Sequence, residues 1–151
     1  STRDWSSDVC SSDLRGRVLA RSAVGRRADD LGIPVWTPAS LRDPLFAEQM
    51  QGLAPDCCPV VAYGSLVPKT VLSMPRHGWV NLHFSLLPAW RGAAPVQHAI
   101  RHGDAVTGAT TFVLDEGLDT GPVIERIEES ISGTDTSGDV LTRLEIGRAH
   151  V

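Results

Sequence analysis

Strand-like and helical patterns alternate at short spacing along this chain, and the alternation limits the folds that are open to it. Apolar runs at residues 59–64, 79–84 and 109–114 are typical of buried strands. A helical pattern at 43–53 precedes the first run, and another at 93–102 separates the second run from the third. This order predicts an α/β domain with a mostly parallel sheet flanked by helices. In such sheets, functional residues gather at the carboxyl ends of the strands.

Shorter elements complete the predicted order. We expect a helix at 22–31, a strand at 33–36, a short helix after Pro68, a strand at 122–131 and a helix at 136–144. Asp43 is expected to cap the helix at 43–53, and Pro44 suits its first turn. Pro59 conflicts with a central strand at 59–64, because proline removes a ladder donor. Either that strand begins after Pro59, or the Cys57–Pro59 stretch is not native sequence.

Bulk features exclude several classes of protein. The 151 residues suffice for one domain with one core, and no apolar run approaches the ~20 residues of a membrane span. Three cysteines, two of them adjacent, make no disulfide framework. The N-terminus has no apolar signal core. We therefore expect a reducing, cytoplasmic setting without membrane attachment.

The charge distribution says more than the net charge of −4. Five arginines and no acidic residue lie between residues 15 and 27: Arg15, Arg17, Arg21, Arg26 and Arg27. On charge alone this stretch is either a solvated face or a loop that contacts phosphates, because clustered arginines neutralise a nucleic-acid backbone.

The two ends of the chain are related to each other through codons and not through protein structure. Residues 8–14 are DVCSSDL and residues 145–151 are EIGRAHV. Codons that encode the second segment encode the first when they are translated from the opposite strand. No folding requirement produces such a relation. We therefore expect residues 1–14 and 145–151 to derive from a sequencing adaptor, so that residues 15–144 carry the fold.

Two polar side chains share one face of the strand predicted at 79–84. Asn81 and His83 alternate with Leu82, which faces the opposite side. Buried polar groups need partners, so both side chains have a structural use if they cap the following loop. Together they also suit catalysis. An amide can donate to a carbonyl oxygen that becomes an oxyanion, and an imidazole can move a proton near neutral pH.

A second polar segment, Asp115–Gly121, joins two predicted strands. Its two glycines and two aspartates within seven residues predict a tight, shaped turn, which an ordinary hairpin does not need. A carboxylate on this turn could orient His83. Metal binding is disfavoured, because His98 and His102 lack the acidic residue of a zinc-binding helix although they are four residues apart.

These segments together resemble the folate-dependent formyltransferases. NLHFSLLPAWRGAAPVQHAI, from residue 81, is similar to the family's N-x-H-x-S-L-L-P segment, and DEGLDTG is similar to its second signature. The stretches at 31–43 and 62–68 match in the same order. The resemblance covers nearly all of 15–144 and implies a Rossmann-like formyltransferase catalytic domain. It also implies that the first strand and a C-terminal barrel-like domain are missing from this chain.

The segment Trp90–Pro95 points to the branch of the family that acts on initiator tRNA. The resemblance implies an enzyme of translation initiation, which transfers a formyl group from 10-formyltetrahydrofolate to the α-amine of methionyl-initiator tRNA. The amine would attack directly, without a covalent enzyme intermediate, and the complete protein would be monomeric. The alternatives are a sibling folate-dependent formyltransferase, a formyltetrahydrofolate hydrolase or an inactive folate-binding fragment.

The resemblance also implies roles for individual residues. Asn81, His83 and Asp119 would be catalytic: Asn81 and His83 would stabilise the oxyanion, and His83 with Asp119 would manage protons. Folate would be bound by Tyr63, Gly64, Leu66, Pro68, Ser85, Leu86, Leu87, Pro88 and Asp115. The tRNA would be contacted by Arg15, Arg17, Trp90, Arg91 and Gly92.

Overall fold

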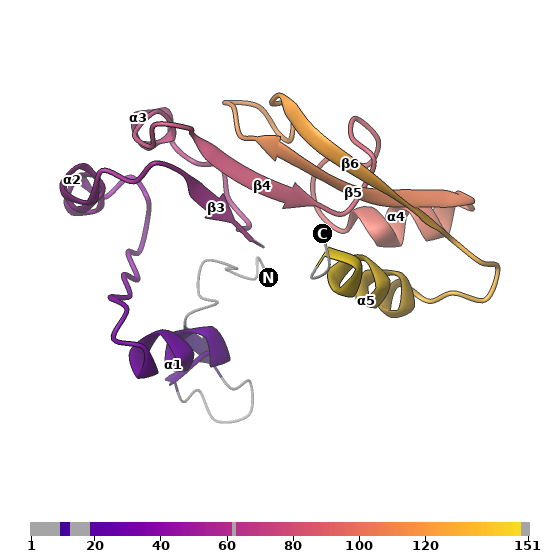
Figure 1. The fold of residues 1–151 in the computed structure, drawn as a ribbon, viewed down its shortest axis with the longest axis horizontal. Helices are drawn as coiled ribbons and strands as arrows, with labels where there is room; N and C mark the ends of the chain where they lie inside the picture. Colours follow the sequence, from indigo (N-terminus) through magenta and orange to yellow (C-terminus); the bar gives the residue numbers. More distant parts are fainter. Residues whose placement is uncertain (1–9, 13–18, 62, 149–151) are drawn as a thin grey trace.

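The computed structural model describes residues 10–12, 19–61 and 63–148 (Figure 1). Its elements are β1 (Cys10–Ser12), β2 (Leu19–Arg21), α1 (Ala23–Asp30), α2 (Pro44–Leu53), β3 (Cys58–Val60), α3 (Lys69–Leu72), β4 (Trp79–His83), α4 (Pro95–His102), β5 (Val106–Val113), β6 (Val123–Ser130) and α5 (Ser137–Arg148). Arg15 and Arg17 lie outside the described residues.

The main sheet has the strand order β3-β4-β5-β6 and mixed strand directions. β3 and β4 are parallel, whereas β4 pairs with β5 and β5 with β6 in antiparallel fashion. The expected α/β class with flanking helices is confirmed. The expectation of a mostly parallel sheet holds for β3 and β4 and is wrong for β5 and β6. Their connection is a hairpin loop, which suits antiparallel neighbours, while parallel neighbours need a long crossover.

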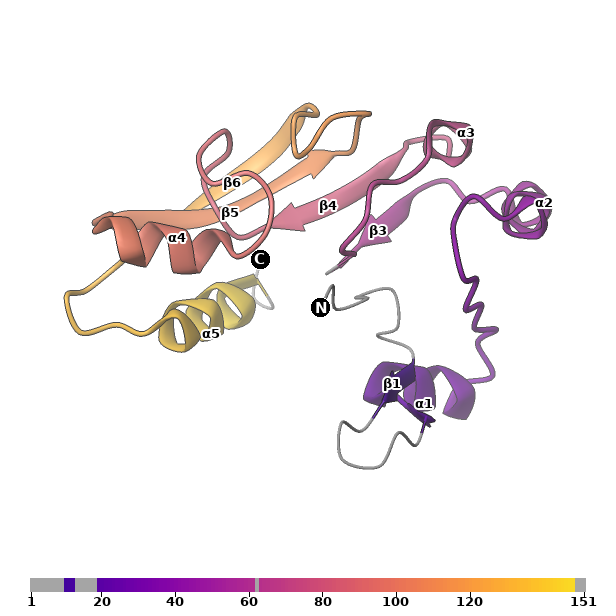
Figure 2. The same cartoon turned by 180° about the vertical axis from the view of Figure 1, so that it is seen from behind.

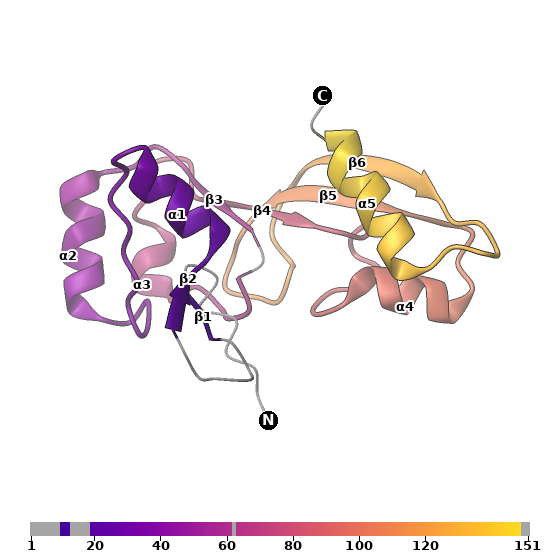
Figure 3. The same cartoon turned by 90° about the horizontal axis from the view of Figure 1, so that it is seen from below.

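Four of the five helices that the structure describes lie in two groups, and each group covers its own buried cluster. α4 and α5 share one face of β5 and β6 (Figures 1 and 2), with Val96, Ala109, Val140 and Leu144 buried between these elements. α2 and α3 lie at the β3 end of the sheet (Figure 3), where Phe46, Met50, Val67 and Val71 form the second cluster. The carboxyl ends of β3 and β4 lie between the two groups.

Several local predictions are confirmed at their boundaries. The Asp43 carboxylate accepts a hydrogen bond from the Leu45 amide (2.9 Å) at the start of α2, and Pro44 occupies the first turn. α4 ends at His102 and is capped by Gly103, whose φ is +78°. The strand expected at 33–36 is wrong, because this segment has no strand partner in the described residues and leaves Ile33 exposed.

β3 is shorter than the strand expected at 59–64, and it includes Pro59. The strand order puts β3 at the edge of the described sheet. An edge strand tolerates proline, because one row of its backbone groups has no ladder partner. Among the described residues, Pro59 thus stands in a strand that pairs with β4 alone.

Candidate active site

A cavity of about 300 Å³ opens at the carboxyl ends of the parallel strands β3 and β4. Its walls come from these two strand ends, from the segment after β3, from the loop after β4 and from the β5–β6 loop. The lining residues are Val60, Tyr63, Gly64, Ser65, Leu66, Val67, Asn81, Leu82, His83, Gly92, Ala93, Leu114, Asp115, Gly117, Leu118 and Asp119. Asn81, His83 and Asp119 therefore meet at one cavity, as strand alternation and the loop position predict. Their catalytic roles stay predictions.

His83 and Asp119 form a close, buried pair. The distance between His83 Nδ1 and Asp119 Oδ2 is 3.7 Å, and the two side chains are only 8% and 12% exposed. β4 fixes His83 through its antiparallel pairing with β5, where His83 lies opposite Thr110. Asp119 has a φ of +50°, a left-handed backbone conformation that aspartate tolerates better than most residues. β4 thus supplies His83, and the loop between β5 and β6 supplies Asp119.

The other ring nitrogen of His83 contacts the backbone. His83 Nε2 lies 2.8 Å from the carbonyl oxygen of Trp90. A carbonyl oxygen only accepts hydrogen bonds, so Nε2 carries the hydrogen. In the neutral ring, Nδ1 then holds a lone pair that faces the Asp119 side of the site. Nδ1 is consequently the atom that can take up a proton, and Asp119 is placed to stabilise the resulting positive charge.

The loop after β4 reaches the pair at two points. Besides the Trp90 carbonyl on His83, the Gly92 amide donates to Asp119 Oδ2 over 2.7 Å. Trp90, Gly92 and Ala94 have φ values of +55°, +86° and +56°. Left-handed residues thus recur at every second position of this loop. The Trp90 carbonyl and the Gly92 amide, two residues apart, both contact the His83–Asp119 pair.

The β5–β6 loop is held by Asp115. Its Oδ1 accepts hydrogen bonds from Thr120 Oγ1 (2.6 Å) and from the Gly117 amide (2.9 Å). The Thr120 hydroxyl lowers the pKa of the Asp115 carboxyl, the Gly117 amide adds to this effect, and the charge of Arg91 contributes further. Asp115 therefore stays ionised at the cavity wall, where it also shapes the turn that carries Asp119.

The residues expected to bind folate divide into three groups. Tyr63, Gly64, Leu66 and Asp115 line the cavity, and Pro68 lines a neighbouring hollow. Ser85, Leu86, Leu87 and Pro88 are outside the lining of both. Direct contact between these four residues and folate stays a prediction, and their position outside both cavities argues against it.

The Ser85–Pro88 turn instead supports the loop after β4. The buried Ser85 hydroxyl donates to the carbonyl of Ala89 (2.6 Å). The Thr110 hydroxyl, from β5, donates to the Ser85 carbonyl (2.6 Å) and accepts from the Leu87 amide (3.1 Å). These three hydrogen bonds hold the turn against β5 and against the start of the following loop.

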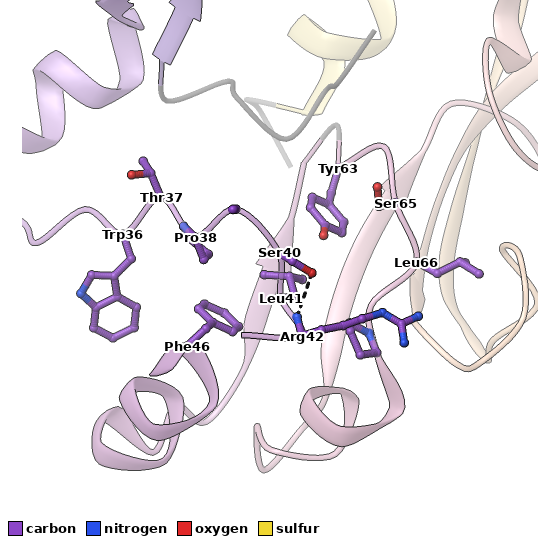
Figure 4. A pocket seen from close by; sticks show the side chains of 12 residues that line it. Trp36, Thr37, Pro38, Ser40, Leu41, Arg42, Phe46, Tyr63, Ser65 and Leu66 are labelled. Carbon is purple, nitrogen blue, oxygen red and sulfur yellow. Dashed lines mark hydrogen bonds between the residues drawn. The ribbon is translucent and has the colours of Figure 1, made fainter. Parts of the chain in front are cut away.

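A second hollow of about 550 Å³ lies beside the cavity and shares Tyr63, Ser65 and Leu66 with it. Figure 4 shows the rings of Trp36 and Phe46 at this hollow, and the Arg42 side chain extending toward the side of Leu66. The Arg42 amide donates to Ser40 Oγ (3.1 Å), which shapes the segment before α2. Sequence reasoning did not predict this hollow as a separate site, although all of its lining residues except Phe46 lie in the matching stretches at 31–43 and 62–68.

Sequence reasoning also missed apolar residues of the cavity wall. Leu114 and Leu118 line the cavity from the β5–β6 loop, and Val67 lines it from the segment before α3. Leu118 stands inside the DEGLDTG segment, which was the only available signal for it. Val67 stands inside the matching stretch at 62–68, and Leu114 directly precedes the DEGLDTG segment.

The residues expected to contact tRNA are placed only in part. Gly92 lines the cavity, Trp90 is half-buried and Arg91 is exposed. Arg15 and Arg17 fall outside the described residues. Within the described ranges, no three or more His, Cys, Asp or Glu side chains are grouped as metal ligands. None of the helices described combines the length and apolarity that a membrane crossing requires.

A mixed α/β sheet with an amide, an imidazole and a carboxylate at neighbouring strand ends defines a domain of the formyltransferase type. The family model described as Formyl transferase matches residues 10–147, and the chain therefore belongs to this family. The methionyl-tRNA formyltransferase of Salinispora tropica is 64% identical over 130 residues, which cover 86% of this chain and 42% of that protein. The corresponding protein of Streptomyces coelicolor is 60% identical over 135 residues, or 89% of this chain and 44% of that protein. The chain thus spans less than half the length of these relatives.

Solved structures of relatives have the same fold. Phosphoribosylglycinamide formyltransferase from Bacillus halodurans superposes with a TM-score of 0.78 at 31% identity, covering 86% of this chain and 71% of that chain. A formyltetrahydrofolate deformylase from Pseudomonas syringae superposes with a TM-score of 0.68 at 28% identity. The match covers 83% of this chain and 43% of that chain. The Rossmann-like formyltransferase fold expected from the sequence is therefore confirmed.

Proposed function

We propose that the complete protein transfers a formyl group from 10-formyltetrahydrofolate to the α-amine of methionyl-initiator tRNA. The identity of 60–64% to proteins named methionyl-tRNA formyltransferase supports this assignment. The observation that carries it is the buried pair of His83 and Asp119 beside Asn81 in one cavity. We further propose that the complete protein acts as a monomer in the cytoplasm.

The dimensions of the site fit a reduced folate in two parts. The cavity of about 300 Å³ is at the lower end of small-molecule sites, which span roughly 300–1,000 Å³. The neighbouring hollow of about 550 Å³ continues it through Tyr63, Ser65 and Leu66. We place the formyl-bearing end of folate against Asn81 and His83. The carboxylate-bearing end would then extend into the hollow toward Arg42, whose positive charge matches it.

The residues of the chain have distinct tasks in this proposal. Bound 10-formyltetrahydrofolate supplies an activated formyl carbon. The Asn81 amide donates a hydrogen bond to the oxygen that gains negative charge, a contribution typically worth a factor of about 10²–10³ in turnover. His83 Nδ1 takes the proton that the attacking amine loses and returns it to the folate nitrogen, as the bond between that nitrogen and the formyl carbon breaks. Asp119 stabilises the imidazolium so formed. No side chain of this set needs to form a covalent bond.

Acceptor binding is proposed for the exposed side of the same loop. Arg91 is exposed and close enough for its charge to act on Asp115. From that loop, Gly92 lines the cavity, and the Trp90 carbonyl contacts His83. We propose that these residues receive the aminoacylated end of the tRNA and that Arg15 and Arg17 contact its phosphates. Arginine suits phosphate recognition through its planar, bidentate donors.

A water molecule is the competing acceptor. The likeness to a formyltetrahydrofolate deformylase supports this second candidate, because an Asn–His–Asp site can also orient water. A third possibility is a domain that binds folate without transferring its formyl group.

An acceptor assay on the complete protein separates these functions. Formylation is measured with 10-formyltetrahydrofolate and either methionyl-initiator tRNA, glycinamide ribonucleotide or water alone. We expect rapid formylation of the tRNA and slow consumption of the folate without it. Faster reaction with glycinamide ribonucleotide, or equal folate consumption without any acceptor, would reject the proposal. Folate binding without turnover would support the binding domain.

A further inference from the structure

The backbone carbonyl that contacts His83 belongs to a residue whose side chain is anchored elsewhere. Trp90 accepts from His83 Nε2 through its carbonyl (2.8 Å) and donates from its indole Nε1 to Asp104 Oδ2 (2.7 Å). We propose that Asp104 and Trp90 are positioning residues that hold His83 in the tautomer with its hydrogen on Nε2. The proposal rests on the proposed function in taking His83 as the proton acceptor, but the tautomer itself is measurable without turnover.

The indole of Trp90 is fixed against the helix that follows it. Its ring stacks on His98 with a centroid separation of 5.8 Å and an interplanar angle of 9°. It also contacts the His102 ring edge-on, with a centroid separation of 4.8 Å and an interplanar angle of 63°. His98 and His102 are one turn apart on α4, and Asp104 follows the end of the same helix. Trp90 is thus tied to α4 by two ring contacts and to the residue just beyond that helix by one hydrogen bond.

This anchoring opposes backbone strain at Trp90. Its φ of +55° is left-handed, and a residue with a Cβ adopts this conformation only at a cost. The hydrogen bond to Asp104 involves a carboxylate, which makes it one of the stronger kinds. Without that bond we expect residue 90 to relax toward negative φ. The peptide plane would then turn, and the carbonyl oxygen would leave His83 Nε2.

The carbonyl matters because Asp119 acts on the opposite nitrogen. A carboxylate beside Nδ1 favours the tautomer with the hydrogen on Nδ1, since that N–H can donate to it. Such a ring has no free lone pair at Nδ1 and cannot accept a proton there. The Trp90 carbonyl favours the other tautomer by accepting from Nε2. The balance between Trp90 and Asp119 therefore decides whether His83 presents a base to the cavity.

The test measures the His83 tautomer in the complete protein, labelled with ¹⁵N at histidine, by long-range ¹H–¹⁵N correlation at a pH where the ring is neutral. The parent protein should show hydrogen on Nε2. Asp104→Leu removes the acceptor and Trp90→Phe removes the indole donor, so both should shift His83 toward the Nδ1–H tautomer. Asp104→Asn keeps an acceptor oxygen and should retain the parent tautomer. If Asp104→Leu fails to fold, Trp90→Phe still tests the proposal.

Turnover provides the second measurement. Asp104→Leu and Trp90→Phe should each lower kcat about tenfold, which is part of the rate factor of about 10²–10⁴ that a positioned base contributes. Asp104→Asn should keep the kcat of the parent. The matched control is Trp79→Phe. Trp79 lies on the same strand as His83, and its indole donates an equivalent hydrogen bond to the Val71 carbonyl (2.9 Å), which the change removes. It should leave the His83 tautomer unchanged.

The two proposals fail in different ways. An unchanged His83 tautomer in both Asp104→Leu and Trp90→Phe, or an Nδ1–H tautomer in the parent, would overturn the positioning role. A tautomer that moves as expected in a protein that formylates no tRNA would instead overturn the proposed function and leave the positioning role intact.

Discussion

Gly92 and Asp119 are joined across the site by a hydrogen bond of 2.7 Å between residues 27 positions apart in the chain. The bond links the loop after β4 to the loop between β5 and β6. It also determines which carboxylate oxygen lies beside the imidazole, because the same Oδ2 accepts from Gly92 and faces His83 Nδ1. The two loops therefore act as one unit in placing the His83–Asp119 pair.

Replacing either member of this pair should reduce turnover with little effect on folding. We expect His83→Ala and Asp119→Asn each to lower kcat for formylation by about 10²–10³ in the complete protein, as for other positioned acid–base groups. Asp119→Asn keeps an oxygen that can accept from Gly92, so the loop contact is preserved. The double variant should lose less than the product of the single losses, because the two groups act as a unit. Near-full turnover in Asp119→Asn would contradict the assigned role.

Asp115 predicts a pH-dependent contribution to stability. Its pKa is lowered in the folded state, chiefly by the Thr120 hydroxyl, so its stabilising effect is present above its ordinary pKa of about 4 and is lost as the pH falls through the folded value. Thr120→Val should reduce the free energy of unfolding at neutral pH, and the difference from the parent should vanish in acid. Urea unfolding from pH 7 to pH 2 measures it. A difference that persists unchanged at the acid end would point to packing and not to the Asp115 charge.

The polar residues of the site could be predicted from sequence because each stands in a short-range pattern. Asn81 and His83 alternate along one strand, and Asp119 lies in a turn rich in glycine and aspartate. Their arrival at one cavity follows from the order of the strands. The cap of α2 at Asp43 was likewise local and is confirmed.

Features that depend on long-range pairing or on backbone conformation could not be predicted. The apolar run at 109–114 fits a parallel or an antiparallel strand equally well, so its direction in β5 was unavailable. Residues 33–36 have strand composition but no partner strand among the described residues. The left-handed backbone of Trp90, which aims its carbonyl at His83, is not a conformation that tryptophan signals in a sequence.

The basic stretch before α1 predicts how acceptor use depends on salt. In the complete protein, Arg15→Ala with Arg17→Ala should weaken the use of methionyl-initiator tRNA and lower the salt slope of its affinity by roughly one for each lost phosphate contact. Folate affinity should not change. Arg76→Ala, at an exposed arginine after α3, is the control for a general loss of charge. Equal weakening of folate binding by the double variant would count against a role in tRNA recognition.

The proposed adaptor origin of residues 1–14 and 145–151 predicts that the last segment adds nothing to the core. Leu144 is buried in the cluster beneath α5, whereas Glu145 is exposed. Deleting 145–151 should change the free energy of unfolding by no more than about 0.5 kcal/mol, as for surface changes in general. Leu144→Ala should cost about 2–5 kcal/mol. A genomic sequence that encodes EIGRAHV at this place, or a large loss of stability on deletion, would reject the adaptor origin.

Two glycines of this chain should respond in opposite directions to the same added methyl group. A Cβ at Gly121 would overlap the Val113 carbonyl oxygen, because the β5–β6 loop closes tightly against the end of β5. Gly121→Ala should therefore cost about 1–3 kcal/mol of stability, as overpacking does, and should lower kcat by displacing Asp119. Gly52, in α2, has open space where its Cβ would lie. Gly52→Ala should stabilise the protein by about 0.4–1 kcal/mol, because alanine loses less backbone freedom on folding into a helix, and should leave kcat unchanged. Urea unfolding and formylation assays on both variants measure these effects. If Gly121→Ala were as stable and as active as the parent, the loop would not be held against β5 in the way that brings Asp119 to His83.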